Sequence, residues 1–337
     1  MKILILESTC DETAAAVVTD SLEVLSSVVA SQEHLHERYG GVVPEIASRA
    51  HVERILPVID ETLKRAGLVI GQIDAVAVAN TPGLAGSLLV GLAAAKALCL
   101  ALDKPLVAVN HLQAHIYACR ISAGRDVFPC LGLIVSGGHT SLYRCATPLE
   151  FELLGGTIDD AAGEAFDKVA SLLGLPFPGG PAIDRIARQG NRAAYAFPRP
   201  LVDTDRLDFS FSGLKTAVRY RIQPPGAAPR DKPLDPATVA DLAASFQEAV
   251  VDCILAKALL AVKRTGIRVL CVGGGVSANG RLRERLEEEM RRREIALYIP
   301  PLNLCTDNAV MGAIALERLK AGLIESLDLD VYPGLVR

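Results

Sequence analysis

Apolar and polar positions alternate along the chain in blocks that predict strands and helices in turn. Apolar β-branched runs indicate strands, whereas apolar residues at helical spacing indicate helices. In the N-terminal third, these patterns predict strands at 3–7, 14–19, 74–79 and 106–109 and helices at 44–66, 84–102 and 110–122. Farther along, they predict strands at 130–135, 141–145 and 269–272, helices at 159–173, 180–189, 237–264 and 278–293, then a short strand and a last helix from 306. Strands that alternate with helices indicate an α/β fold with mostly parallel pairing.

The two series share a layout at their first strands. LILESTCDETAAAVV at 4–18 and LIVSGGHTSLYRC at 133–145 each consist of an apolar strand, a tight turn of small polar residues and a second strand. This is a weak internal repeat. Two such hairpins, one in each domain, are how the actin-like ATPase fold holds phosphates from both sides. Two unrelated hairpins in an α/β protein are the alternative at this point.

Composition narrows the class of protein. The 337 residues are a little over twice a usual domain of about 150, so we expect one large or two medium domains. Half of the residues are hydrophobic, but only 4% are aromatic and none is Trp, which indicates an aliphatic core of sheets covered by helices. The 35 basic and 39 acidic residues give a net charge of −4. Taken alone, that charge argues against a nucleic-acid-binding protein.

Cysteine usage and the apolar segments predict a cytoplasmic protein without a membrane span. None of the eight cysteines forms a C-x-x-C pair, so buried reduced thiols explain them better than disulfides or a zinc knuckle. The continuous apolar run before Glu7 is only four residues long, too short for the apolar region of a signal peptide. The longest apolar stretch, 84–102, contains Lys96, two glycines and a serine. It is typical of a buried Ala-rich helix rather than of a membrane-spanning helix.

The sharpest chemical feature is the segment NHLQAH at 110–115. His111 and His115 lie at i and i+4, so both imidazoles face one side of a helix and can share a metal ion. A metallopeptidase would need Glu after the first histidine as general base, and Leu112 stands there instead. A third ligand must come from elsewhere, and Asp307 in a polar break before an apolar helix is the candidate. Helix N-capping by Thr306 or Asp307 explains that break equally well.

Glycine-rich turns form a second group of features. The segment GGGVSANGR at 273–281 follows a strand and precedes a helix, so its backbone can approach a nucleotide closely. It matches neither the Rossmann nor the P-loop pattern, and a purely structural turn is the alternative. SGGHT at 136–140 is a similar strand-end turn. A helix that is acidic at its start contains Asp167, and PGGPAID at 178–184 begins another helix. Acids in a first helical turn complement the helix dipole, which is a purely structural explanation.

Two polar segments receive no functional assignment from their pattern. Residues 281–294 contain six arginines and five glutamates, which is more typical of a solvated helix with i,i+4 ion pairs than of a nucleic-acid groove. The helix is nevertheless the candidate for a local basic patch. His34 and His36 lie among glutamates, and we expect both at the surface.

Taken together, these segments resemble the TsaD family, the tRNA adenosine threonylcarbamoyltransferases once labelled O-sialoglycoprotein endopeptidases. The resemblance spans nearly the whole chain. It is carried by ESTCDET at 7–13, GGVVPEIASRAH at 40–51, NHLQAH at 110–115, VSGGHT at 135–140, GEAFDKVA at 163–170, FPGGP at 177–181, FSFSGLK at 209–215, GGGVSANGRLR at 273–283 and TDNAVMGA at 306–313. Nine segments in this order make coincidence a poor explanation.

The resemblance implies a two-domain actin-like ATPase fold, shared with Hsp70 and sugar kinases, with a central cleft. We expect one domain at 1–127 plus 306–330, and a second at 128–305 with a helical and Pro-rich insertion at about 175–237. The implied reaction is metal-assisted transfer of the threonylcarbamoyl group from threonylcarbamoyl-AMP to the exocyclic amine of adenosine 37. The implied tRNAs read codons that begin with adenine.

The resemblance also assigns residues. His111, His115 and Asp307 match the family's metal ligands, with Fe2+ expected and Zn2+ as the alternative. Glu12 matches a residue implicated in activity. The positions that match the adenylate-binding site are Ile134, Val135, Ser136, Gly137, Gly138, Asp167, Gly180, Asp184 and Asn279. Archaeal and eukaryotic relatives have a metal-binding Tyr where this chain has Ile134, so the sequence fits the bacterial branch.

Partners and alternative functions follow from the same resemblance. The family works with a TsaB-like paralogue, a TsaE-like ATPase and a TsaC-like synthase that makes threonylcarbamoyl-AMP. A kinase or ATPase of the same fold is the main competing function, and it would have no use for two helical histidines. A binding platform without turnover is a third possibility. The net charge of −4 predicts that tRNA is held by a local basic patch or by a partner's surface.

Overall fold

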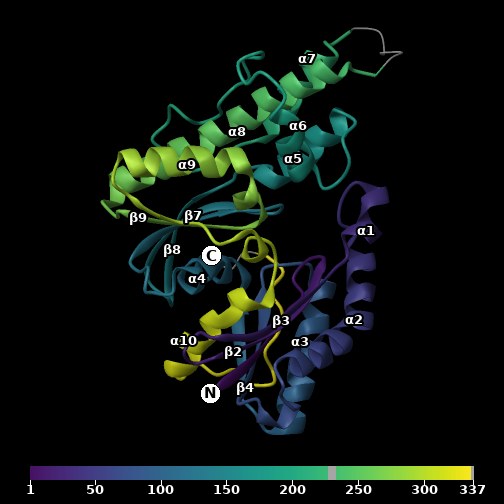
Figure 1. Cartoon of the computed structure of the whole chain (residues 1–337), viewed down its shortest axis with the longest axis vertical. Coiled ribbons are helices and arrows are strands. Elements are labelled where there is room, and N and C mark those ends of the chain that lie inside the picture. Colours follow the sequence, from purple (N-terminus) through teal and green to yellow (C-terminus); the bar gives the residue numbers. More distant parts are fainter. Residues whose placement is uncertain (227–232, 335–337) are drawn as a thin grey trace. The chain divides into compact units, whose positions relative to one another are not determined.

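The computed structural model describes residues 1–226 and 233–334, which form two compact units (Figure 1). The first unit comprises Met1–Val127, Ala146–Phe151 and Pro300–Arg337, and the second comprises Phe128–Cys145 and Glu152–Ile299. The helical and Pro-rich insertion expected at about 175–237 includes residues 227–232, which lie outside the described residues. Each unit is built around its own five-stranded sheet.

The sheet of the first unit has the order β3-β2-β1-β4-β5. Its strands are β1 (Lys2–Glu7), β2 (Glu12–Thr19), β3 (Val24–Ser31), β4 (Ala75–Thr81) and β5 (Leu106–Asn110). β1 is antiparallel to β2 and parallel to β4, and β4 is parallel to β5. The central strands are buried on both faces, which explains their continuous apolar runs.

Helices cover both faces of this sheet. One face, with Leu4 and Leu6, packs against α2 (Pro44–Arg65) and α3 (Ala85–Leu102). The other face meets the 3-10 helix η5 (Ala309–Ile314), where a Cβ on Gly312 would lie 2.5 Å from Ile5 Cγ2. Next to η5 lies α4 (His111–Ala123). The shorter elements are α1 (Glu33–His36), η1 (Glu37–Tyr39), η2 (Ile70–Gln72), η4 (Leu302–Leu304) and α10 (Ala315–Lys320).

α3 is long and apolar enough to cross a membrane by composition alone. In the structure, α3 packs on β4 and α2, and residues such as Leu88 and Leu92 are buried in that contact. Only 33% of the helix is buried, so the expectation of a buried helix holds for its inner side alone. Seven of the eight cysteines are likewise buried and all eight are free thiols.

The second sheet has the order β10-β9-β6-β7-β8. This is the strand order of the first sheet when that sheet is read from its other edge, β5-β4-β1-β2-β3. Its strands are β6 (Cys130–Val135), β7 (Thr140–Thr147), β8 (Glu150–Gly156), β9 (Val269–Gly273) and β10 (Ala296–Tyr298). β6 is antiparallel to β7 and parallel to β9, as β1 is to β2 and β4. The internal repeat suggested by the two hairpin segments is therefore confirmed as a repeat of sheet topology.

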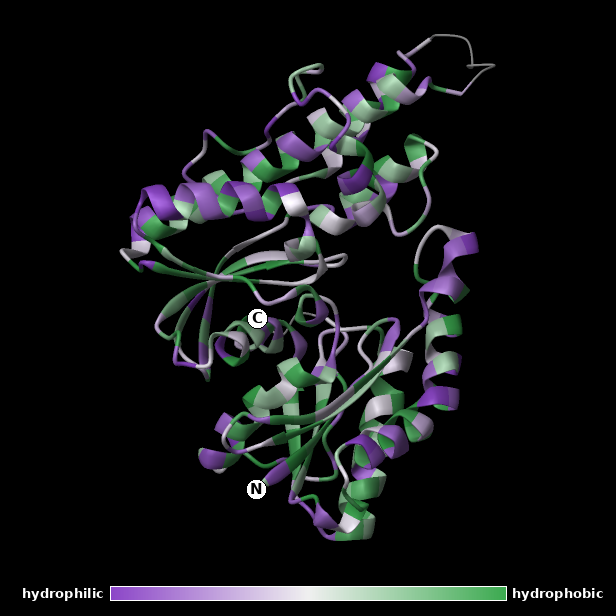
Figure 2. Ribbon diagram, in the orientation of Figure 1, coloured by the Kyte–Doolittle hydropathy of each residue, from purple (hydrophilic) through white to green (hydrophobic). Residues whose placement is uncertain are grey.

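One continuous apolar core joins the second sheet to its helices. These are α5 (Ala162–Leu172), α6 (Gly179–Ala187), α7 (Ser212–Ile222), α8 (Pro236–Thr265), the 3-10 helix η3 (Gly275–Ala278) and α9 (Gly280–Arg292). α8 is the longest and contributes most of its length to the core. α9 is hydrophilic along its outer side (Figure 2) and buries only Leu282, Leu286 and Met290.

Candidate functional site

The N-terminus of α4 carries the first part of the site. Asn110 ends β5, and its side-chain oxygen accepts hydrogen bonds from the N–H groups of Leu112 (2.9 Å) and Gln113 (3.2 Å). This N-cap begins the helix at His111. His111 and His115 therefore lie one turn apart on one face, and their ring centroids are 4.7 Å apart.

Asp307 joins the two histidines. Its Oδ1 atom lies 3.5 Å from His111 Nε2 and 3.2 Å from His115 Nε2. One ligand-type atom from each of the three residues lies within 4.8 Å of the others. His115 is fully buried, and neither ring nitrogen has a hydrogen-bond partner among the described residues. A buried imidazole in that state is costly unless it binds something else, so the three side chains fit a shared divalent cation.

The structure contradicts the helix-capping role considered for Thr306 and Asp307. The N-cap of η5 is neither Thr306 nor Asp307 but Asn308, whose side chain accepts a hydrogen bond from Met311 N–H at 3.2 Å. Because Asn308 caps the helix, the carboxylate of Asp307 is directed to the histidines instead. The helix predicted from 306 accordingly begins later, at Ala309.

A buried carboxylate supports His111 on the opposite side of its ring. Glu7 ends β1, is 3% exposed and places Oε2 3.2 Å from His111 Nδ1. Thr9 Oγ1 lies 3.1 Å from the same nitrogen, and Thr9 N–H donates to Glu7 Oε1 at 2.8 Å. A carboxylate in this position fixes a metal-binding histidine and raises its basicity. Burial opposes a charge on the ring, but Asp307 and Glu7 outweigh it and raise the pKa of His111 to about 9.

Glu12 begins β2, at the end of the turn that follows Glu7. Burial is the main cause that raises the pKa of Glu12 to about 10, followed by the charges of Asp307 and Asp11 and a hydrogen bond with Asp11. Ser31 Oγ also donates to Glu12 Oε1 at 3.4 Å. These surroundings favour the protonated form of the Glu12 carboxyl, which can donate a hydrogen bond.

In the second unit, two glycine turns follow the parallel strands β6 and β9. Gly137 and Gly138 are exposed, and a Cβ on either would meet nothing within 4 Å. Gly274 has φ of 91°, and a Cβ there would lie 2.5 Å from Val135 O. This close approach requires glycine and brings the second turn against the end of β6. Exposed backbone N–H groups at such turns suit a phosphate, whereas the side chains of Ile134 and Val135 are fully buried.

Two of the predicted residues, Asp167 and Gly180, lie where α5 and α6 approach each other. Asp167 Oδ1 accepts a hydrogen bond from Gly179 N–H at 2.7 Å and so ties α5 to the first turn of α6. The next residue, Gly180, has open space where a Cβ would lie. At the other end of α5, Gly163 N–H donates to Ser136 O at 3.1 Å and holds the helix against the first glycine turn.

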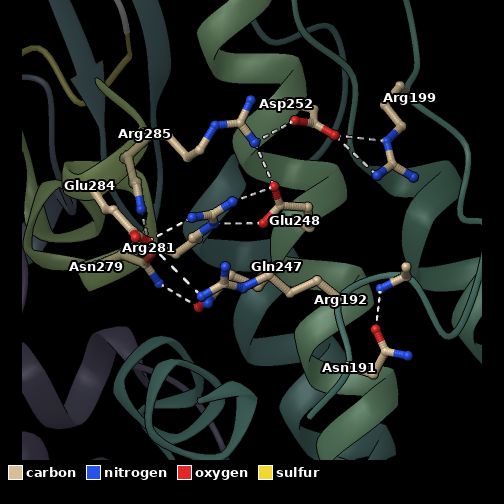
Figure 3. Close-up of polar contacts among 12 residues, drawn as sticks. Asn191, Arg192, Arg199, Gln247, Glu248, Asp252, Asn279, Arg281, Glu284 and Arg285 are labelled. Atoms are coloured by element: carbon tan, nitrogen blue, oxygen red, sulfur yellow. Dashed lines mark hydrogen bonds and ion pairs between the residues drawn. The ribbon is translucent and has the colours of Figure 1, made fainter. Parts of the chain in front are cut away.

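Asn279 and Asp184 lie at the junction of α6 and α9. Asn279 Oδ1 accepts a hydrogen bond from Leu282 N–H at 3.0 Å, and Asn279 Nδ2 donates to Gln247 Oε1 at 2.8 Å (Figure 3). Asp184 Oδ2 would lie 3.3 Å from a Cβ on Gly280, so the start of α9 approaches the second half of α6 closely. Of the predicted residues, Gly137 and Gly138 lie in a turn, Gly180 and Asn279 lie at helix starts, and Asp167 and Asp184 lie within α5 and α6. Ile134 and Val135 stand apart, inside a strand.

The arginines in the first half of α9 are used within the protein (Figure 3). Arg281 donates to both carboxylate oxygens of Glu248 at 2.7 and 2.8 Å, and Arg285 donates to Glu248 at 2.5 Å and to Asp252 at 3.1 Å. Burial would raise the pKa of Glu248, but these arginines lower it. The prediction of a merely solvated helix is therefore wrong for this half, because its arginines fasten α9 to α8.

Several supporting residues were missed or misplaced by the sequence pattern. His51 is fully buried on α2 and lies 2.8 Å from Thr13 Oγ1, where it braces the β1–β2 turn. His36, predicted at the surface, is fully buried and accepts a hydrogen bond from Val43 N–H at 3.2 Å. The sequence could have indicated Glu7, because this charged residue directly follows an apolar run. No local pattern indicates Gln247, because its hydrogen-bond partner, Asn279, lies 32 positions away in the sequence.

Comparison with solved structures identifies the fold. The activator of 2-hydroxyisocaproyl-CoA dehydratase from Clostridium difficile superposes with a TM-score of 0.54 at 13% identity, covering 96% of this chain and 97% of that one. The ROK hexokinase from Thermus thermophilus has a TM-score of 0.50 at 14% identity, covering 96% and 100%. At this identity the likeness concerns the fold alone, and it confirms the predicted actin-like ATPase fold.

Comparison with sequences identifies the family. The model of the family described as "TsaD: tRNA N6-adenosine threonylcarbamoyltransferase" matches residues 23–314. A protein of that name from Rhodopirellula baltica is 54% identical over 99% of this chain and 97% of its own length. Another, from Symbiobacterium thermophilum, is 53% identical over 99% and 96%. With matches of this extent to bacterial relatives, the chain belongs to the TsaD family of tRNA N6-adenosine threonylcarbamoyltransferases.

Proposed function

We propose that the chain transfers the threonylcarbamoyl group from threonylcarbamoyl-AMP to the exocyclic amine of adenosine 37, in tRNAs that read codons beginning with adenine. The observation that carries this proposal is the cluster of His111, His115 and Asp307 in a chain 54% identical to a relative named for the transfer. The new bond joins N6 of adenine to the carbamoyl carbon. The bond from that carbon to the phosphate oxygen breaks, AMP leaves, and the amine proton passes to solvent.

His111, His115 and Asp307 would hold the metal ion. Two imidazole nitrogens and one carboxylate oxygen suit iron or zinc, and we assign Fe2+ to the site with Zn2+ as the alternative. Such an ion, when bound, would supply a Lewis acid that polarises a carbonyl group. Glu7 supports the assignment because it orients the ring of His111 from the opposite nitrogen.

The remaining chemistry needs no protein nucleophile, because the mixed carbamoyl–phosphate anhydride is already activated. The pKa of Glu12 is raised to about 10, and in its protonated form this carboxyl would donate a hydrogen bond to an oxygen of the donor substrate. The adenine amine is a weak nucleophile, so most of the rate enhancement would come from positioning.

The second unit would bind the adenylate. Exposed backbone at Gly137 and Gly138 offers N–H groups to the phosphate and to developing negative charge. Ile134 and Val135 would contribute through their backbone, because their side chains are buried. Asn279 and Asp167 already hold the turn and helix starts through hydrogen bonds. The full set proposed for the adenylate is Ile134, Val135, Ser136, Gly137, Gly138, Asp167, Gly180, Asp184 and Asn279.

The proposed transfer requires other proteins. We infer that a TsaC-like synthase supplies threonylcarbamoyl-AMP, and that a TsaB-like paralogue and a TsaE-like ATPase assemble with this chain. We also place the protein in the cytoplasm, where tRNA is modified. Packing of the apolar helix α3 against β4 and α2 supports a protein that does not span a membrane.

A transfer assay tests the proposed function. The metal-loaded protein is mixed with threonylcarbamoyl-AMP and an unmodified tRNA transcript, with and without a TsaB-like partner, and the nucleosides are analysed. We expect threonylcarbamoyladenosine with wild-type protein and with His34→Ala, whose side chain is exposed, but none with His111→Ala. Equal product from His111→Ala at unchanged folding would refute the assigned chemistry. A protein that retains only magnesium and transfers phosphate from ATP would instead be a kinase of the same fold.

A further inference from the structure

α7 is a basic helix without acidic residues. Ser212–Ile222 has the sequence SGLKTAVRYRI, with Lys215, Arg219 and Arg221 as its charged side chains. Arg219 and Arg221 are exposed and Lys215 is half-buried. Tyr220 lies between the two arginines in sequence and is 52% exposed. In a chain whose net charge is −4, this helix is a local concentration of positive charge.

The charges of α7 are not neutralised within the protein. In the part of the chain that the structure describes, none of the three side chains forms an ion pair with a carboxylate. Lys215 and Arg219 are i,i+4 neighbours of like charge, an arrangement that destabilises an isolated helix. The recorded contact of Arg221 is with an aromatic ring, because its guanidinium lies 4.8 Å from the ring centroid of Tyr195. The helix therefore presents cations that have no counter-charge of their own.

The arginines of α9 provide the contrast within the same unit. Arg281 and Arg285 bind Glu248 and Asp252, as described above. In the second half, Arg292 and Arg293 pair with Glu289 at 2.6 and 3.2 Å. α9 is richer in arginine, yet most of its positive charge is balanced by acids. α7 differs in that none of its three cations has an ion pair among the described residues.

α7 is also held firmly in place. The Asp159 carboxylate accepts hydrogen bonds at the helix start from Phe211 N–H at 2.8 Å, from Ser212 N–H at 3.3 Å, and from the hydroxyls of Ser210 and Ser212 at 2.6 and 2.8 Å. These bonds outweigh burial and lower the pKa of Asp159. Leu214 and Val218 are fully buried and anchor the helix in the core. A surface on such a helix is preorganised for binding.

We propose that the basic residues of α7, Lys215, Arg219 and Arg221, together with Tyr220, bind the sugar–phosphate backbone of tRNA. Phosphates supply the counter-charge that the helix lacks. Aromatic rings and guanidinium planes stack on unpaired RNA bases, and Tyr220 with the Arg221–Tyr195 pair offers both. An acidic polypeptide would use the charges but not the exposed ring, so RNA is the better match. This inference rests on the proposed function, because it takes tRNA as the substrate.

The experiment measures tRNA affinity against salt with the full chain. The test variant is Lys215→Gln/Arg219→Gln/Arg221→Gln. The matched control is Arg291→Gln/Arg292→Gln/Arg293→Gln, which removes the same formal charge from α9. A second variant, Lys215→Arg/Arg219→Lys/Arg221→Lys, keeps the charge of α7 and reports on folding. Binding of a labelled, unmodified tRNA transcript is followed by fluorescence anisotropy between about 50 and 200 mM salt, the range over which counterion release is readily seen.

The glutamine variant of α7 should weaken tRNA binding by at least about tenfold at low salt and reduce the slope of log K against log salt by about two to three. The KM for tRNA should rise, whereas kcat and the KM for threonylcarbamoyl-AMP should stay unchanged. The α9 control and the charge-keeping variant should bind tRNA within about twofold of wild type, since neither alters the phosphate contacts proposed for α7.

Two results would overturn the proposal. One is unchanged tRNA affinity and salt slope in the glutamine variant of α7. The other is competition by polyglutamate as strong as competition by RNA of equal charge, which would identify a surface for acidic polypeptides. Failure of the proposed function is a separate outcome. In that case wild-type protein would bind tRNA through α7 but form no threonylcarbamoyladenosine.

Discussion

At the scale of single residues, the two histidines of α4 differ in what surrounds them. His111 has Glu7 near one ring nitrogen and Asp307 near the other, whereas His115 has Asp307 near Nε2 and no partner at Nδ1 among the described residues. The first ring is therefore oriented by the protein before any metal binds. The second depends on a bound ion to satisfy it.

Glu7 should matter for metal affinity although it is not a ligand. Glu7→Gln keeps the shape of the side chain but removes the charge that supports His111. We expect metal affinity to fall by about 10–100-fold, the usual effect of losing such a support. Competition with a chromophoric chelator measures it. Glu53→Gln, at an exposed position on α2, is the control, and equal affinities of the two variants would contradict the role.

Glu317 should stabilise the first unit in a pH-dependent way. Its Oε1 atom accepts hydrogen bonds from Tyr117 Oη (2.9 Å) and Arg120 Nη1 (2.7 Å). Burial opposes its charge, but these bonds prevail and lower the pKa of Glu317. A carboxyl with a lowered pKa stabilises the fold above its unfolded pKa, and the contribution is lost as pH falls through the folded pKa. We expect Glu317→Gln to cost about 1–3 kcal/mol at neutral pH.

The measurement for Glu317 is urea unfolding of wild type and Glu317→Gln at neutral pH and at acidic pH. The difference between the two proteins should shrink on the acidic side. A difference that stayed constant across the range would show that the carboxylate charge contributes nothing.

At the scale of elements, the sequence predicts the central strands well and the edges poorly. β1, β4 and β6 are buried on both faces, so each is a continuous apolar run. β3 and β8 were missed because they are half-exposed and lack that signal. α7 was missed because its outer face is basic and only Leu214 and Val218 are buried. Exposure on one side removes the apolar pattern on which the prediction depends.

The glycine turn after β9 gives a test at this scale. Gly274→Ala would force a side chain into a positive φ and within 2.5 Å of Val135 O. We expect a loss of about 1–3 kcal/mol in the free energy of unfolding and weaker adenylate binding, because the turn must move away from β6. Gly275→Ala is the matched control, since a Cβ there meets nothing within 4 Å. If both variants unfolded at the same denaturant concentration, the close approach would not constrain the turn.

At the scale of the whole molecule, two sheets with the same strand order each carry a tight turn after their first strand. The histidine pair and Asp307 were predictable because local motifs reveal chemistry even when the fold is unknown. The supports were not predictable, because Glu7, His51 and Gln247 act through contacts made only when distant segments fold together. The net charge of −4 argued against a nucleic-acid substrate. It now indicates instead that positive charge must be local, as on α7.

The most direct test of the central claim is the yield of threonylcarbamoyladenosine at position 37 of an ANN-decoding tRNA, with wild type and Asp307→Asn compared. Asparagine keeps the size of the side chain but removes the charge that faces His111 and His115. We expect product at position 37 with metal-loaded wild type, and a large loss of both metal and product with Asp307→Asn, whose fold circular dichroism should show intact. Undiminished modification by a metal-free Asp307→Asn protein would contradict the account.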